Sequence, residues 1–250
     1  MKKLIIQSIF VFVFVSNLYS QPSKNDYIIG YGSLAVFSLT QFPLFPYLAP
    51  QKPAWKIAPE TDIFFRKKLK WQNKNLRKAA FYSDILLDGI FLPSVFWTPL
   101  LSKEKYAHHL LLNIEVASAT GILTNLAKFI TGRQRPYSYY STLESEGLDD
   151  YLSFFSGHTS LTFAIATSTS MIFEKKEPQI SGLIWSSSIA LAALTGYLRI
   201  AGDKHYMTDV LTGVVLGSLT GYLITEHQQK RFFKNKSTQN FQLTLVLPIR

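Results

Sequence analysis

Three short segments of the sequence carry basic residues and histidines whose types and spacing suit phosphate chemistry. The first runs from Lys128 to Pro136 and places Lys128 and Arg135 seven positions apart. A helix that ends near Gly132 would let the following loop fold Arg135 back toward Lys128. Basic residues at a helix C-terminus also favour the helix dipole, so this segment alone does not identify a ligand site.

The second segment, Ser156-Gly157-His158, opens an apolar stretch that predicts a helix. Ser156 is a favourable N-cap residue, and Gly157 lets the backbone approach a ligand closely. The free N–H groups at the start of a helix form an anion site that suits phosphate. His158 would stand at the entrance of that site, although a single histidine at a helix start is more often only a surface residue.

The third segment contains Arg199, His205 and Asp209. His205 and Asp209 are four positions apart, so they share one helix face, and the carboxylate can fix the tautomer of the imidazole. A metal ion fits this pair poorly. The lysine and arginines of the three segments would repel a divalent cation, and no further ligand has suitable spacing.

Together the three segments provide the parts of a phosphoryl-transfer site. Three cations and a helix N-terminus can stabilise a phosphate whose charge distribution shifts in the transition state. One histidine with a neighbouring aspartate can attack the phosphorus, and the other histidine can protonate the leaving alcohol. This chemistry requires neither a metal nor a cofactor.

The ordered set resembles the type 2 phosphatidic acid phosphatase (PAP2) superfamily, which includes membrane lipid phosphatases, soluble class A acid phosphatases and vanadium haloperoxidases. Its pattern is K-x6-RP, then PSGH, then SR-x5-H-x3-D. Phe155 replaces the proline of the second motif, which affects the rigidity of that loop, and Leu198 replaces the serine of the third, which removes one hydrogen bond near the phosphate. The matching positions are Lys128, Arg135 and Pro136, then Ser156, Gly157 and His158, then Arg199, His205 and Asp209.

The resemblance implies a role for each matched polar residue. His205 is the nucleophile that forms a phosphohistidine, and Asp209 orients it. His158 is the general acid on the leaving oxygen and then activates water. The groups implied to hold the phosphoryl oxygens are Lys128, Arg135, Arg199, the Ser156 hydroxyl and the Gly157 N–H. No metal or cofactor is implied.

Six apolar stretches predict the helices that must position these residues. They cover residues 27–41, 83–101, 106–130, 158–174, 180–200 and 206–226. Overlapping GxxxG steps at Gly213, Gly217 and Gly221 favour close helix packing, as in membrane bundles, although a tightly packed soluble bundle can share this feature. We therefore expect an all-α, six-helix bundle of the PAP2/acid phosphatase type that is embedded in a membrane. A soluble periplasmic enzyme of the same superfamily is the alternative.

Composition limits the class of protein. Of the 250 residues, 47% are hydrophobic and only 17% are charged, which excludes a disordered chain. The absence of cysteine excludes disulfides and cysteine-bound metals. The net charge is +10, and nine cations lie among aromatic residues in residues 51–80. This segment is expected to be a solvated surface helix or to lie against anionic headgroups, and nucleic acid is not expected as a partner.

The chain organisation indicates export. Residues 1–20 have a basic start, an apolar stretch and a small polar end, which predict a signal peptide or, alternatively, an uncleaved anchor. We assign residues 21–80 to an N-terminal helix and the basic aromatic segment, 81–230 to the phosphatase core and 231–250 to a C-terminal tail. The expected location is the bacterial inner membrane, with the site facing the periplasm.

The function expected from this pattern is metal-independent hydrolysis of a phosphomonoester or diphosphate, with a phosphorylated lipid as substrate. Three alternatives remain open: a soluble periplasmic non-specific acid phosphatase, a non-catalytic membrane protein that binds lipid phosphate, and a haloperoxidase, which is disfavoured because those enzymes are much longer. The acidic stretch at residues 144–150 is expected to lie near the site and to influence substrate choice.

Overall fold

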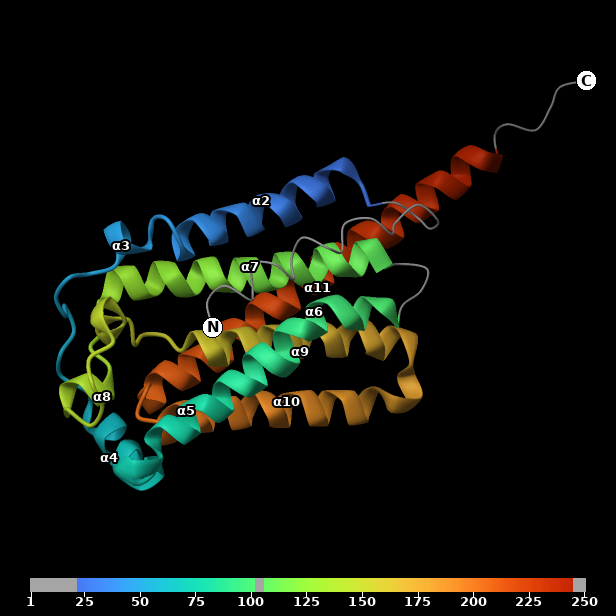
Figure 1. Ribbon diagram of the computed structural model, residues 1–250. Helices are drawn as coiled ribbons and strands as arrows, with labels where there is room; N and C mark the ends of the chain where they lie inside the picture. The colour runs from blue at the N-terminus through green and yellow to red at the C-terminus, as the bar shows by residue number, and fades with distance from the viewer. Residues whose placement is uncertain (1–21, 102–105, 245–250) are drawn as a thin grey trace, which may run out of the picture.

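The computed structural model describes residues 22–101 and 106–244, with side chains as far as residue 231. In that part of the chain, six long helical segments form a bundle without strands (Figure 1). The long segments are α2 (Lys24–Gln41), the joined α5 (Leu76–Asp84), η2 (Ile85–Phe91) and α6 (Leu92–Leu100), α7 (Tyr106–Thr131), α9 (Gly157–Lys176), α10 (Pro178–Ala201) and α11 (Met207–Thr244). The short elements are α3 (Phe45–Leu48), α4 (Glu60–Leu69), η1 (Asn73–Asn75), α8 (Pro136–Tyr139) and η4 (Gly147–Tyr151). The predicted all-α fold is confirmed.

Helix α9 is the centre of the bundle. It packs against α7, α10 and α11, while α2 lies along the outer side of α7 (Figure 1). The interior of α9 is built from small and apolar residues, among them Ala164, Ile165 and Ala166, each at most 2% exposed. Its hydroxyl side chains bond within the bundle; for example, Thr225 donates to Ser168 at 3.0 Å.

The predicted helix at residues 83–101 is part of a longer helical run that contains a π-helical segment, η2. Pro93 follows this segment and has no N–H to donate to the carbonyl of the preceding turn. A local widening of the helix absorbs such a missing bond. Pro93 therefore does not end the helical run, which contains a π-helical segment and continues to Leu100.

Among the described residues, four helical segments are long and apolar enough to cross a membrane. They are Asn73–Leu100, Tyr106–Thr131, Pro178–Ala201 and Met207–Arg231. Their outward faces expose large apolar side chains, such as Ile130 at 72% and Leu183 at 70%. Contiguous apolar surface of this kind suits contact with lipid, so the fold is that of a membrane protein.

One cation of the basic segment at residues 51–80 is buried, while most of the others are exposed. Helix α4 places Arg66 in the interior, where its Nε donates to the buried Asp203 at 2.7 Å. At least this cation is therefore not available to solvent or to anionic headgroups. At the other end of the chain, α11 continues to Thr244, so much of the stretch expected as a tail is helical. The expected signal peptide at residues 1–20 lies outside the described residues.

The GxxxG glycines bring α11 onto the backbone of α9. A Cβ atom on Gly217 would lie 2.2 Å from the Ser160 carbonyl oxygen, and one on Gly221 would lie 2.4 Å from the Ala164 carbonyl oxygen. Only glycine permits this approach without moving one of the helices. Because His158 lies at the start of α9 and His205 lies just before α11, this contact sets the distance between the two histidine segments.

We expect Gly217→Ala to lower the free energy of unfolding by about 1–3 kcal/mol and to reduce activity, because the new methyl group must push α11 away from α9. Gly182→Ala in α10 is the matched control, since a Cβ there has no atom within 4 Å. The control should be neutral or slightly stabilising, because alanine is the better helix former. Equal denaturation midpoints for the two variants in detergent would contradict the packing argument.

Candidate active site

The three motif segments meet at one end of the bundle. Helix α7 ends at Thr131, α9 begins at Gly157, and α10 and α11 are joined by the short loop after Ala201 (Figure 1). Gly132 ends α7 with φ +50°, a conformation that favours glycine. Because these helices end or begin here, the predicted residues at four helix ends lie in one place.

His205 is 2% exposed and has a defined hydrogen-bond arrangement. Its Nδ1 lies 2.8 Å from the Ser153 carbonyl oxygen, which can only accept, so Nδ1 carries the proton. Nε2 is then the unprotonated nitrogen and lies 3.1 Å from Arg135 Nη1. Burial and the neighbouring cations, with Arg135 foremost, hold the pKa of His205 well below its usual value, so the imidazole is neutral near pH 7.

Asp209 supports His205 less directly than its spacing predicts. Its Oδ2 lies 3.6 Å from His205 Nδ1, beyond a normal hydrogen bond. The same oxygen accepts from the Ser153 hydroxyl at 2.6 Å and from the Tyr206 backbone N–H at 2.8 Å. The other carboxylate oxygen accepts from Arg133. Asp209 thus fixes Ser153, whose carbonyl in turn holds the imidazole.

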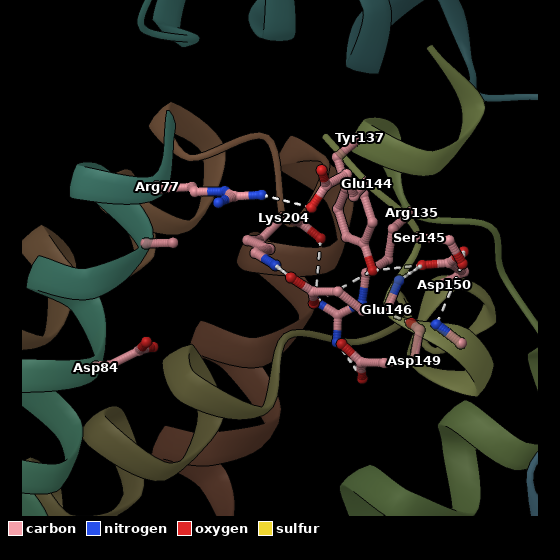
Figure 2. A network of polar contacts seen from close by, with 12 residues as sticks. Arg77, Asp84, Arg135, Tyr137, Glu144, Ser145, Glu146, Asp149, Asp150 and Lys204 are labelled. Atoms are coloured by element: carbon pink, nitrogen blue, oxygen red, sulfur yellow. Dashed lines mark hydrogen bonds and ion pairs between the residues drawn. The ribbon is translucent and has the colours of Figure 1, made fainter. Parts of the chain in front are cut away.

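Arg135 joins the His205 segment to the acidic loop. Its Nε donates to the Asp149 carbonyl at 2.8 Å, and its Nη2 donates to the Asp149 carboxylate at 2.9 Å (Figure 2). Nη1 bonds the Lys204 carbonyl and faces His205. Although burial opposes it, the charge of Arg135 holds the pKa of Asp149 at about 2. The expectation that the stretch at residues 144–150 lies near the site is confirmed.

His158 and Arg199 meet at a residue that was not predicted for the site. Asp84 Oδ1, at the end of α5, lies 2.9 Å from His158 Nε2 and 3.2 Å from Arg199 Nη1. The Arg199 Nε is buried and has no hydrogen-bond partner among the described residues. An unpaired buried donor is costly, and a phosphate oxygen would satisfy it.

The remaining predicted residues surround the start of α9. The position of a Cβ on Gly157 is 3.6 Å from Lys128 Nζ, so glycine keeps this space open beside the lysine. Ser156 caps α9: its hydroxyl oxygen accepts from the Thr159 hydroxyl at 2.9 Å and, more weakly, from the Thr159 N–H. The charges of Arg135, Arg199, Lys128 and His158 all act on the His205 imidazole, so the predicted set is assembled around it.

Several supporting residues were missed from the sequence, and their signals differ. Arg133 lies inside the first motif but was given no role, and Asp62 lies within the basic segment as one of its few acids. Asp84 carried a usable signal, because a carboxylate in an apolar helix is costly unless it faces polar partners. Ser153 left no signal in the sequence, because it acts through its backbone carbonyl. Within the described residues, no group of three metal-ligating His, Asp or Glu side chains occurs.

Comparison with known proteins gives the same family as the motifs. The model of the PAP2 superfamily matches residues 110–233. The chain is 29% identical over 127 residues to a lipid A 1-phosphatase of Porphyromonas gingivalis, covering 50% of this chain and 24% of that protein. It is 26% identical to a lipid A 4'-phosphatase of the same organism, covering 74% of this chain and 66% of that protein. It is 28% identical to bovine phospholipid phosphatase 2, covering 62% of each protein.

A solved structure of another protein shares the fold. It is described as the first transmembrane PAP2 type phosphatidylglycerolphosphate phosphatase from Bacillus subtilis, and it aligns with a TM-score of 0.57 at 18% identity. The alignment covers 83% of this chain and 98% of that one. The chain spans less than two thirds of the length of each curated relative named above. The family match, the motifs and the shared fold together identify this chain as a protein with a PAP2 superfamily domain.

Proposed function

We propose that this protein is a metal-independent phosphatase that hydrolyses a phosphomonoester or diphosphate of a lipid through a phosphohistidine. The observation that carries the proposal is the state of His205: a neutral, buried imidazole whose unprotonated Nε2 faces Arg135. The curated relatives, named as lipid A and phospholipid phosphatases, support the same substrate class.

In the first step, His205 Nε2 attacks phosphorus and the bond to the leaving oxygen breaks. Burial and Arg199 lower the pKa of His158 to about 4, and the negative charge of a bound phosphate opposes this shift. The protonated imidazole gives its Nε2 proton to the leaving oxygen, which departs as an alcohol. Lys128, Arg135 and Arg199 hold the phosphoryl oxygens. The Arg199 Nε–H, which has no partner among the described residues, donates a hydrogen bond to one of these oxygens. Ser156 and the Gly157 N–H contribute at the start of α9, as the resemblance implies.

In the second step, His158 takes a proton from water as the water oxygen attacks phosphorus. The bond between phosphorus and His205 Nε2 breaks, and its electron pair returns to the imidazole. Asp209 contributes by holding Ser153, whose carbonyl keeps the His205 proton on Nδ1. Inorganic phosphate leaves, and both histidines regain their starting states.

The proposed location is the bacterial inner membrane, with the site facing the periplasm. The four candidate spans support membrane embedding, and the basic start of the sequence supports export. A protease added to intact spheroplasts checks the orientation, because cleavage near α8 would require that end of the bundle to face the periplasm. Activity found only in a soluble periplasmic fraction would favour the acid-phosphatase alternative.

Phosphate release from p-nitrophenyl phosphate in the presence of EDTA tests the activity. We expect turnover by the detergent-solubilised protein without added metal, and faster turnover of phosphatidic acid in mixed micelles. Retention of phosphate lipids without any release would contradict catalysis and favour the non-catalytic binding protein. Activity that EDTA abolishes would contradict the metal-independent mechanism.

A further inference from the structure

A pocket of about 290 Å³ adjoins the candidate active site beside Asp84. Its polar wall comes from α5, from the acidic loop before η4 and from Lys204 (Figure 2). The side chains that carry the argument are Arg77, Phe81, Asp84, Glu144, Glu146 and Lys204. We propose that this pocket binds the part of the leaving group next to the scissile phosphate, and that it selects a neutral, hydroxyl-rich group such as a sugar ring.

Asp84 connects the pocket with the reaction. Its Oδ1 accepts from the Nε2 of His158, the nitrogen that protonates the leaving oxygen in the proposed function, on which this inference rests. A general acid must lie within hydrogen-bond reach of the atom it protonates. The leaving oxygen must therefore approach the position that Asp84 Oδ1 occupies, and the group attached to it extends into the pocket that Asp84 lines.

The charges of the pocket disfavour a second phosphate. Two cations, Arg77 and Lys204, face the three carboxylates of Asp84, Glu144 and Glu146, so the formal charge of these walls is −1. Both cations are already paired: Arg77 Nη2 lies 2.9 Å from Glu144 Oε2, and Lys204 bonds Glu146. An additional anionic group would have to displace a glutamate and approach the remaining carboxylates.

The same side chains suit hydroxyl groups. Each hydroxyl both donates and accepts, so it can bond a carboxylate and a neighbouring ammonium or guanidinium without breaking their pairing. Phe81, at 56% exposure, offers an apolar ring to the C–H face of a sugar. A pocket of this size holds a headgroup rather than acyl chains, which the apolar outer faces of the bundle can accommodate.

The acidic loop at residues 144–150 is held in place before any ligand arrives. Asp150 accepts from the Tyr137 hydroxyl and the Ser145 hydroxyl at 2.6 Å each, and from the Glu146 N–H at 2.9 Å (Figure 2). Lys204 also lies 4.5 Å from the centre of the Tyr137 ring. A preformed wall of this kind loses little conformational freedom on binding, which favours selectivity.

The test compares the Arg77→Ala/Glu144→Ala double variant with Glu226→Ala/Lys230→Ala, which removes an ion pair on α11 whose residues do not line the pocket. Glucose 1-phosphate, p-nitrophenyl phosphate and inorganic pyrophosphate are the substrates. We expect the pocket variant to lose about tenfold in kcat/KM on glucose 1-phosphate and less than twofold on the aryl phosphate. The α11 variant should match the unmodified protein on all three substrates.

Equal losses on the sugar and aryl phosphates would overturn the proposal, as would an unchanged rate on glucose 1-phosphate. A loss confined to pyrophosphate would assign the pocket to a second phosphate and overturn it as well. Calorimetric binding of glucose 1-phosphate and phenyl phosphate separates this inference from the proposed function. Absent turnover contradicts the phosphatase, whereas equal affinity losses for both ligands in the pocket variant contradict the sugar subsite alone.

Discussion

His205→Ala is expected to lower kcat by about 10^4-fold or more while leaving the fold intact. The variant removes the Nε2 that faces Arg135, and with it the nucleophile of the proposed reaction. The structural cost is limited to the contacts of the imidazole, from Nδ1 to the Ser153 carbonyl and between Nε2 and Arg135 Nη1. Circular dichroism and the denaturation midpoint in detergent check the fold, and phosphate release from p-nitrophenyl phosphate checks the rate.

His158→Ala is the informative comparison for this prediction. p-Nitrophenolate leaves without protonation, so this variant should still transfer phosphate to His205 once. Without His158 to activate water, the phosphoenzyme should accumulate, with a burst of about one nitrophenol per protein and an acid-labile phosphohistidine. His205→Ala should show neither. Near-normal turnover by His205→Ala, or a burst in that variant, would exclude His205 as the nucleophile.

The parts of the site that could be predicted from sequence are those whose chemistry depends on side-chain type at short spacing. His205 and Asp209, or Lys128 and Arg135, are close in the chain, so local geometry already limits where they can point. Apolar stretches and small-residue patterns likewise predicted the long helices, because burial and close packing act on every turn. Gly217 shows this directly: its contact with Ser160 is the reason for the GxxxG step.

The parts that could not be predicted depend on contacts between distant segments. Asp84 reaches His158 across 74 positions, and Asp62 reaches Arg133 across 71. Ser153 acts through a backbone carbonyl, which any residue type would supply, so its identity carries no signal for that role. Spacing also overstated the part played by Asp209, because a carboxylate one turn away can be satisfied by other donors.

Arg133→Met is expected to lower the free energy of unfolding by about 3–5 kcal/mol and to reduce kcat strongly. Arg133 is 1% exposed and lies between two carboxylates of 0% exposure, those of Asp62 and Asp209. Removing the guanidinium leaves both carboxylates buried without their shared cation. Because Asp209 positions Ser153, and Ser153 holds His205, the same change disturbs the position of the proposed nucleophile.

Addition of Asp62→Asn to Arg133→Met separates this charge effect from lost packing. The asparagine removes one uncompensated carboxylate while its amide oxygen still accepts from the Thr208 N–H, which bonds Asp62 at 2.8 Å. The double variant should therefore be more stable than Arg133→Met alone, by chemical denaturation in detergent. Lys230→Met breaks an exposed pair and should leave stability unchanged. If the losses of unfolding free energy are instead additive in the double variant, Arg133 does not act mainly by neutralising Asp62 and Asp209. It would then act mainly through its packing on the Trp55 ring, whose centre is 3.9 Å away.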